Sequence, residues 1–250
     1  MAPAKKHGSR FGVSMAMGDA GPGTRVALLI PCFNAGPRVE PVVRGAASVA
    51  SQVFVIDDGC TDGCLDGLDI PGVTILRHER NRGKGHALLT GFRAALEQTR
   101  AECIATLDAD GQHDASDLPA LFDAFEHSQA DLLIGARSMA RQGVPWASRI
   151  GNTVTAAVTR ALLPGCPRDT QSGYRLHRRH FLERILPEIH PGRYETEMEI
   201  LVRALRGGFA VREHPIATRY EAGNASSHFR KVQDSWRIYR RLGASLLRGG

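Results

Sequence analysis

The chain has 250 residues, of which 42% are hydrophobic and 23% charged, as in a soluble globular protein and unlike a disordered or fibrous one. That length suits one large α/β domain or two small ones. The formal net charge of +6 favours anionic partners, but the sequence has no block of Lys and Arg and no RNA-binding signature. We therefore expect a phosphorylated substrate or an anionic membrane surface, and no nucleic acid.

The cysteines and the apolar segments indicate the cellular compartment of the protein. The five cysteines are odd in number and scattered: Cys32, Cys60, Cys64, Cys103 and Cys166. Cys60 and Cys64 lack the C-x-x-C spacing and no His pair follows, which disfavours zinc and favours a reduced, cytoplasmic protein. No apolar stretch approaches the roughly 20 residues that span a bilayer. Residues 1–24 lack the apolar core of a secretory signal and are predicted to be a disordered lead-in.

Short apolar runs alternate with helical periodicity through the first half of the chain. The predicted strands are 26–30, 53–56, 73–76, 103–107 and 131–135, and the predicted helices are 38–51, 86–98 and 117–125. Each strand ends in polar or glycine residues. We therefore predict an α/β fold with a mostly parallel twisted sheet and helices on both faces.

The second half is less regular. We predict a loop over 137–149, a helix over 150–163, a loop over 166–175 and a helix over 194–206, with no element assigned to 176–193. Residues 209–216 are predicted to form an edge strand, because Pro215 cannot donate to a central ladder. The domain should extend over 25–232. Residues 233–250 are predicted to form an amphipathic basic helix that lies on an anionic leaflet or packs on the domain.

Polar side chains follow several of the predicted strands. Because the carboxyl ends of parallel strands gather at one edge of a sheet, we expect one cleft there. Its lining should include Asn34, Asp57, Asp58, Lys84, Asp108 and Asp110. The first strand is not followed by G-x-G-x-x-G, which disfavours a dinucleotide-binding Rossmann domain, and the sequence has no P-loop motif.

Asp108 and Asp110 come directly after the apolar run 103–107. In extended backbone, residues two apart point the same way, so the two carboxylates would converge. Converging carboxylates repel unless a cation lies between them, and hard divalent cations prefer oxygen ligands. The pattern predicts Mg²⁺ or Mn²⁺ here, with coordination positions left for substrate phosphates. A solvated Asp-rich turn is the alternative.

Four motifs occur in one order along the chain. They are Pro31-x-Phe33-Asn34, Asp57-Asp58-Gly59-x-Thr61-Asp62, Asn81-x-Gly83-Lys84-Gly85 and Asp108-x-Asp110-Gly111-Gln112, and Asp169-x-x-Ser172-Gly173-Tyr174-Arg175 follows. From about Val26 to about Arg230, the chain resembles a family 2 glycosyltransferase of GT-A fold, in particular the dolichyl- or polyprenyl-phosphate mannose or glucose synthases. It departs at Ala35, where that group frequently has Glu, and at Cys60, which replaces the usual Ser.

The resemblance implies an inverting transfer of a hexose from a GDP- or UDP-sugar to a polyprenyl-phosphate acceptor. It implies that Pro31, Asn34, Asp57, Asp58, Lys84 and Asp108 bind the nucleotide sugar, and that Asp108, Asp110 and Gln112 hold Mg²⁺ or Mn²⁺. Arg137, Arg149, Ser172 and Arg175 would bind phosphates. Asp108, Asp110, Asp169 and Arg175 are the expected catalytic residues.

The acceptor and the reaction class leave alternatives. A lipid phosphate is already anionic and needs no strong base, whereas a hydroxyl acceptor would need one, for which Asp169 is the best candidate. A sugar nucleotidyltransferase would need a glycine-rich basic loop after the first strand, where this chain has Pro31-Cys32-Phe33-Asn34. A non-catalytic binding protein would be expected to have lost its metal ligands or the loop over 169–175, and this chain keeps both.

Overall fold

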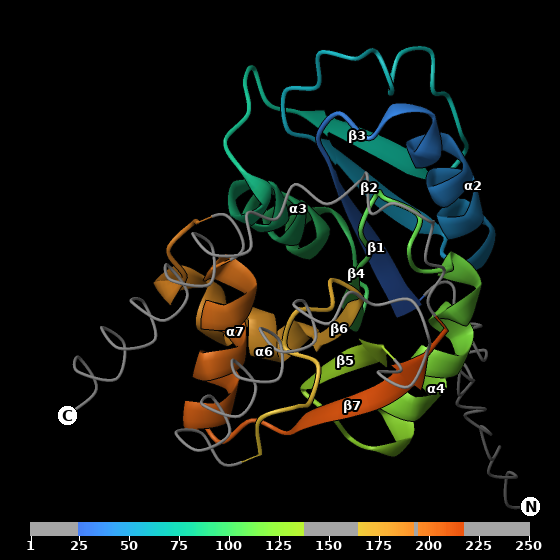
Figure 1. Cartoon of the computed structure of the whole chain (residues 1–250). Coiled ribbons are helices and arrows are strands. Elements are labelled where there is room, and N and C mark those ends of the chain that lie inside the picture. Colours follow the sequence, from blue (N-terminus) through green and yellow to red (C-terminus); the bar gives the residue numbers. More distant parts are fainter. Residues whose placement is uncertain (1–24, 138–164, 193–194, 218–250) are drawn as a thin grey trace, which may run out of the picture.

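A seven-stranded sheet runs through the computed structural model, which describes residues 25–137, 165–192 and 195–217 (Figure 1). The strand order is β3-β2-β1-β4-β6-β5-β7. The strands are β1 (Val26–Cys32), β2 (Gln52–Asp57), β3 (Val73–Arg77), β4 (Cys103–Thr106), β5 (Leu132–Arg137), β6 (Arg175–Arg178) and β7 (Val211–Ile216). Within this sheet β6 is antiparallel to both of its neighbours, and the other pairs are parallel. The carboxyl ends of β1, β2, β4 and β5 therefore share one edge, as predicted.

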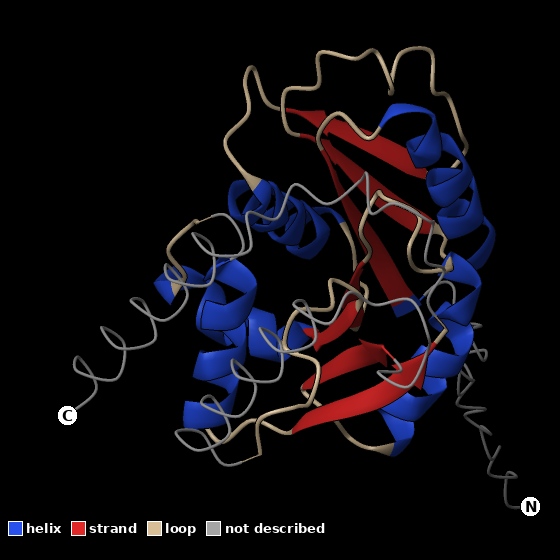
Figure 2. Ribbon diagram, in the orientation of Figure 1, coloured by secondary structure: helices blue, strands red, loops and turns tan. Residues whose placement is uncertain are grey.

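Helices cover both faces of the sheet (Figure 2). On one face lie α2 (Val39–Val49) and α4 (Leu118–His127); on the other lie α3 (Lys84–Gln98), α6 (Arg179–Ile185) and α7 (Glu195–Arg206). Alternate residues of β1 belong to the two cores: Leu28 and Ile30 pack beneath α2 and α4, and Ala27 and Leu29 pack on the other side. A strand buried on both faces is continuously apolar, which explains the uninterrupted run that marked β1 in the sequence.

The structure moves two predicted boundaries that matter for function. β4 ends at Thr106, and Asp108 and Asp110 lie in the turn that follows, so the prediction that extended backbone aligns them is wrong. α3 begins at Lys84 instead of His86, because Gly83 adopts φ 95° at the helix N-cap. Only glycine takes such a backbone conformation easily. Lys84 therefore lies in the first turn of a helix.

The region without a predicted element contains β6 and α6, together with the 3₁₀ turn Leu186–Glu188. The β6 sequence is Arg-Leu-His-Arg, and both Arg175 and His177 are buried in it. Charged residues are rarely buried, so nothing in the local pattern indicated a strand. The predicted edge strand is confirmed as β7, which pairs with β5 alone among the described strands.

Several predictions lie outside the described residues. These are the lead-in over 1–24, Arg149, the helix over 150–163 and the amphipathic helix over 233–250. In the described part of the chain, no helix combines the length and the apolarity needed to cross a membrane.

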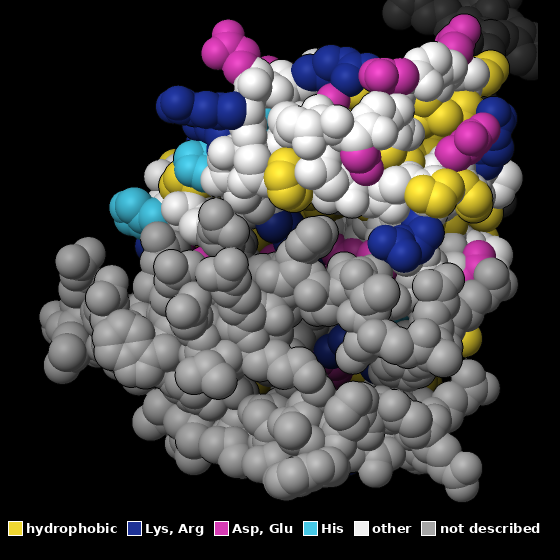
Figure 3. Space-filling view, turned by 45° about the horizontal axis from the view of Figure 1, so that its top comes forward, with side chains coloured by type: hydrophobic (Ala, Val, Ile, Leu, Met, Phe, Trp, Pro, Cys, Tyr) yellow, Lys and Arg dark blue, Asp and Glu magenta, His cyan; other side chains and the backbone are white. Residues whose placement is uncertain are grey.

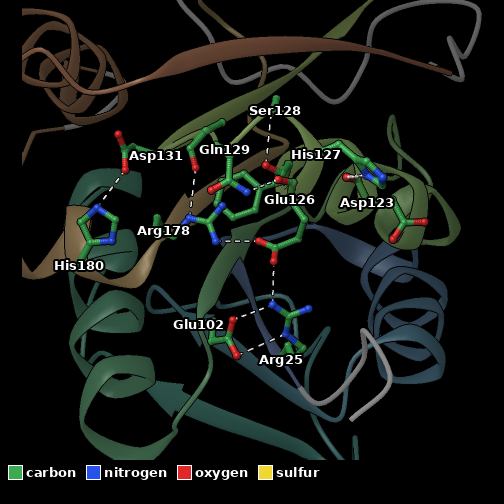
Figure 4. Close-up of polar contacts among 12 residues, drawn as sticks. Arg25, Glu102, Asp123, Glu126, His127, Ser128, Gln129, Asp131, Arg178 and His180 are labelled. Carbon is green, nitrogen blue, oxygen red and sulfur yellow. Dashed lines mark hydrogen bonds and ion pairs between the residues drawn. The ribbon is translucent and has the colours of Figure 1, made fainter. Parts of the chain in front are cut away.

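Ion pairs join the elements at the other end of the sheet (Figure 4). Arg25 donates to Glu102 at 2.7 Å and to Glu126 at 2.7 Å, and Glu126 also accepts from Arg178 at 2.6 Å. The Arg25 and Arg178 guanidinium groups lie over the rings of Phe122 and Phe125. This network connects the start of β1 to α4 and to the end of β6, away from the edge that carries Asp57, Asp58 and Asp108.

Candidate active site

Lys84 lies at the centre of the candidate site. Its Nζ atom is 2.7 Å from Asp108 Oδ1 and 3.0 Å from Glu197 Oε2. Burial acts to lower the pKa of the Lys84 ammonium, but the two carboxylates outweigh that effect and the net shift is upward. A charged lysine thus joins α3, the turn after β4 and α7. Sequence reasoning missed Glu197, because nothing in the acidic first turn of α7 distinguishes it from Glu195 and Glu199.

Asp108 and Asp110 are close enough to affect each other's ionisation. Burial acts to raise the pKa of the Asp108 carboxyl, but Lys84 more than offsets it and the net shift is downward. The pKa of Asp110 is raised by its burial and by the negative charge of Asp108. Asp110 Oδ1 accepts a hydrogen bond from the backbone N–H of Gln112 at 3.0 Å. The second carboxylate is therefore held in an unfavourable environment that additional positive charge would relieve.

This donor set fits a hard divalent cation. Asp108 and Asp110 supply carboxylate oxygens, and Gln112 carries an amide oxygen in the same turn. The backbone of Gly173 lies against Asp108: a Cβ atom at position 173 would be 2.2 Å from Asp108 Oδ2. Thr106 Oγ1 donates to the Gly173 carbonyl at 2.8 Å, which holds this backbone in place. Glycine is thus required beside the turn that carries Asp108 and Asp110, which we call the acidic turn.

Asp57 and Asp58 both have partners within the chain. Asp58 Oδ1 lies 2.7 Å from His78 Nδ1, and Asp58 Oδ2 accepts from the backbone N–H of Gly83 at 2.7 Å. Asp57 Oδ2 accepts from Arg77 at 2.6 Å. Asp58 therefore positions the start of α3, and with it Lys84. The predicted contacts of the two aspartates with a nucleotide stay predictions.

Pro31 and Asn34 belong to the end of β1 and the loop after it. Pro31 is part of the strand and pairs in register with Ile56 of β2. Asn34 adopts φ 50°, and its Oδ1 accepts from the backbone N–H of Thr61 at 2.8 Å. The first two motifs of the resemblance are therefore in direct contact through Asn34 and Thr61.

Asp169 and Arg137 form a bidentate ion pair. Asp169 Oδ2 lies 2.7 Å from Arg137 Nε, and Asp169 Oδ1 lies 2.9 Å from Arg137 Nη2. Burial acts to raise the pKa of the Asp169 carboxyl, but the hydrogen bonds and charge of Arg137 outweigh it and the net shift is downward. The pair fixes the guanidinium at the carboxyl end of β5. A carboxylate with a lowered pKa is a weak proton acceptor.

Arg175, which was predicted to bind phosphate, contacts backbone carbonyls in this structure. Its side chain is buried, and its three nitrogens donate to the carbonyls of Ser172, Glu197 and Thr170, each at 2.8 Å. Ser172 is also buried, and its Oγ accepts from the backbone N–H of Tyr174 at 3.3 Å. These contacts position the loop before β6 against α7. The phosphate contacts predicted for Ser172 and Arg175 stay predictions.

His113 is a second residue that sequence reasoning missed. It is buried, and in the described structure its Nδ1 has no hydrogen-bond partner. Burial lowers its pKa, while Asp108, Arg137 and Asp169 act on it electrostatically. His113 therefore lies near Asp108 and near the Arg137–Asp169 pair. Its place directly after Gln112 in the fourth motif was the available signal.

Hydrogen bonds and ion pairs thus link most of the predicted residues, either directly or through residues next to them in the chain. The connected set contains Asn34, Asp57, Asp58, Lys84, Asp108, Asp110, Gln112 and Arg175, with Glu197 added. On the face seen in Figure 3, acidic, basic and apolar side chains of the described residues are interspersed. The described part of that face therefore carries no continuous basic patch like those that bind a nucleic-acid backbone.

Comparisons with known proteins identify the relatives of this chain. Residues 27–186 match the family model for glycosyl transferase family 2. The polyprenol monophosphomannose synthase of Mycolicibacterium smegmatis is 31% identical over 215 residues, which cover 81% of this chain and 80% of that protein. The undecaprenyl-phosphate mannosyltransferase of Micrococcus luteus is 30% identical over 213 residues, covering 77% and 82%.

The solved structures add the fold. The chain superposes on glucosyl-3-phosphoglycerate synthase from Mycobacterium tuberculosis, solved with Mn²⁺, uridine diphosphate and phosphoglyceric acid, with a TM-score of 0.67 and 19% identity. That match covers 90% of this chain and 78% of the other. The fold is therefore GT-A-like, as the resemblance implied. The family match extends over the strands and turns that carry the site, and the chain belongs to glycosyl transferase family 2.

Proposed function

We propose that this glycosyltransferase moves a hexose from a nucleotide sugar to a polyprenyl phosphate, with a divalent cation at the acidic turn. The observation that carries the proposal is the similarity to two enzymes named for polyprenyl-phosphate mannose transfer. Each is 30% or 31% identical over about four-fifths of both chains. Similarity of that extent includes the acceptor-side loop before β6 as well as the motifs on the donor side.

The donor side centres on the acidic turn. Asp108, Asp110 and Gln112 would hold Mg²⁺ or Mn²⁺, which when bound neutralises the charge that grows on the departing nucleoside diphosphate. Lys84 keeps Asp108 ionised and in place, with Nζ 2.7 Å from Oδ1. The solved neighbour that shares this fold was crystallised with Mn²⁺ and uridine diphosphate.

The acceptor side favours a phosphate over a hydroxyl. A phosphate oxygen can attack the anomeric carbon as the bond to the nucleoside diphosphate breaks, and no proton has to be removed. Direct attack of this kind inverts the anomeric configuration. A hydroxyl acceptor would need a base, and the candidate Asp169 is engaged by Arg137 on both oxygens with its pKa lowered. We assign Asp169 the role of positioning Arg137, whose guanidinium would contact a phosphate.

A transfer assay with matched acceptors tests the proposal. The full-length protein is incubated with radiolabelled GDP-mannose, UDP-glucose or UDP-N-acetylglucosamine, and with either polyprenyl phosphate or the corresponding polyprenol. We expect label to enter the lipid phase with the phosphate only, and chelation of divalent metal to abolish transfer. Label on the polyprenol alone would establish the hydroxyl alternative. Failure with every donor, in the presence of Mg²⁺ or Mn²⁺, would reject the proposal.

A further inference from the structure

Three cysteine thiols meet at the carboxyl ends of β1 and β2. Cys32 is the last residue of β1, and Cys60 and Cys64 lie in the loop after β2. The Cys32 and Cys64 sulfurs are 3.8 Å apart, and those of Cys60 and Cys32 are 3.9 Å apart. Within the described ranges, this is the one group of three His, Cys, Asp or Glu side chains whose ligand atoms all lie within 4.8 Å of one another.

The sulfur spacing matches that of a thiolate metal site. Four sulfurs arranged tetrahedrally at a Zn–S distance of about 2.3 Å are about 3.8 Å from one another. The Cys32–Cys64 and Cys32–Cys60 separations of 3.8 and 3.9 Å have this value without any movement of the backbone, and the Cys60 and Cys64 sulfurs lie within 4.8 Å of each other. Three protein ligands leave a fourth position for water or another donor. The spacing of Cys60 and Cys64 in the sequence disfavoured zinc because two neighbouring cysteines were judged alone. The fold supplies Cys32 as the third sulfur.

Backbone hydrogen bonds are available to two of the sulfurs as thiolates bound to a cation. The backbone N–H of Asn34 donates to Cys60 Sγ at 3.3 Å, and the backbone of Ala35 hydrogen-bonds Cys64. Hydrogen bonds of this kind orient metal ligands and tune their basicity. Burial raises the pKa of Cys60 to about 12 and raises those of Cys32 and Cys64 as well. The thiols therefore stay protonated until a cation replaces their protons.

The loops after β1 and β2 are joined by contacts that do not involve the sulfurs. The backbone N–H of Gly36 donates to Asp62 Oδ2 at 2.9 Å, and the backbone N–H of Cys64 donates to Asp62 Oδ1 at 3.2 Å. Asn34 and Thr61 add a further hydrogen bond across the same junction. The three sulfurs are therefore held in place by a framework that does not depend on them.

We infer that Cys32, Cys60 and Cys64 form a binding site for one thiophilic metal ion of the Zn²⁺ class, distinct from the oxygen site at Asp108 and Asp110. Soft thiolates select Zn²⁺ over the hard cations that carboxylates bind, so the two sites take different metals. The bound ion would join the end of β1 to the loop after β2. Because Asp57 ends β2 and Asp58 begins the loop after it, the ion would rigidify the predicted nucleotide-binding edge.

Co²⁺ is the probe that reports on sulfur ligands. The full-length protein is reduced, freed of metal with a chelator and titrated with Co²⁺, then with Zn²⁺ as competitor. We expect one equivalent of Co²⁺ to give a thiolate-to-metal charge-transfer band and the visible absorption bands of a tetrahedral Co²⁺ ion. Added Zn²⁺ should abolish both sets of bands. Asp110→Asn should leave these bands unchanged, which separates this test from the fate of the proposed transferase activity.

Cysteine variants decide which sulfurs are involved. Cys60→Ser and Cys64→Ser should each abolish the charge-transfer band and weaken Zn²⁺ binding by roughly 100-fold or more, since loss of even an outer-shell partner costs about 10–100-fold. Cys166→Ser, which removes a cysteine outside the group, is the matched control and should retain the band. Zn²⁺ should also protect Cys60 and Cys64 from alkylation, measured by peptide mass.

Two results would overturn the inference. The first is a reduced wild-type protein that binds Co²⁺ without a thiolate band. The second is a band that persists in the Cys60→Ser/Cys64→Ser double variant. Circular dichroism of each variant shows that the fold is intact, and the alkylation pattern of the wild-type protein gives an answer that requires no substitution.

Discussion

At the scale of single residues, the acidic turn depends on a neighbour without a side chain. A Cβ atom at Gly173 would lie 2.2 Å from Asp108 Oδ2. We expect Gly173→Ala to displace the Asp108 carboxylate and to lower the transfer rate by about 100-fold, because misplacing a reacting group by about 1 Å has that effect. Steady-state transfer rates measure it. Gly45→Ala is the control, since its new Cβ would meet only Ala115 at an ordinary 3.6 Å, and its rate should be unchanged.

Lys84 has a structural effect as well as a chemical one. In the wild-type protein Lys84 Nζ lies 2.7 Å from Asp108 and 3.0 Å from Glu197. Lys84→Met removes this ammonium and leaves the two carboxylates close together without a cation between them. Removing one partner of a buried ion pair costs about 3–5 kcal/mol, so we expect a loss of that order in the free energy of unfolding, measured by urea denaturation. The double variant Lys84→Met/Glu197→Gln should recover part of it. Additive effects would contradict the proposed contact.

At the scale of secondary structure elements, α3 and α7 meet where Lys84 is held. A Cβ atom at Gly85 would be 2.1 Å from both the Gly192 carbonyl and Thr196 Oγ1. We expect Gly85→Ala to force the helices apart, to cost about 1–3 kcal/mol of stability and to reduce transfer by displacing Lys84. Denaturant unfolding and the transfer assay measure the two effects. His86→Ala, one residue further along the same turn, should change neither by a comparable amount.

The ion-pair network at the opposite end of the sheet should affect stability alone. Burial acts to raise the pKa of Glu126, but Arg25 and Arg178 outweigh it and the net shift is downward. A depressed carboxyl pKa gives stability that is present above the unfolded value and is lost as the pH falls through the folded one. We expect Glu126→Gln to lower the unfolding free energy at pH 7 by about 1 kcal/mol or more. The transfer rate of the folded variant should equal that of wild type; a reduced rate would show that the network reaches the site.

At the scale of the whole molecule, buried histidines make stability depend on pH. Burial lowers the pKa of His177 to about 3, and the ring lies edge-on to Phe92 with centroids 5.0 Å apart. The unfolded chain takes up its proton near pH 6.5, so the folded state loses stability as the pH falls below that value, by about 1.4 kcal/mol per unit at most, until about pH 3. His177→Gln should reduce this slope between pH 6.5 and pH 4.5. An unchanged slope in urea denaturation at several pH values would contradict the assignment.

Much of the fold could be predicted because its determinants are local. The apolar runs of β1, β2 and β4 and the periodicity of α3 are properties of contiguous segments, and polar residues directly after strands indicated the functional edge. β6 could not be predicted, since Arg175 is stable in the interior only through carbonyls supplied by Ser172, Thr170 and Glu197. The pattern of apolar residues along the chain does not predict such contacts.

The sequence by itself therefore determined the family, the order of the strands along the chain and the acidic turn, because motifs and periodicities are written in neighbouring residues. Only the tertiary structure decided which side chains meet. It placed Glu197 beside Lys84, engaged Asp169 with Arg137, and added Cys32 to Cys60 and Cys64. Those pairs are far apart in the chain, and their contacts arise from how the sheet and its helices pack, which no local pattern specifies.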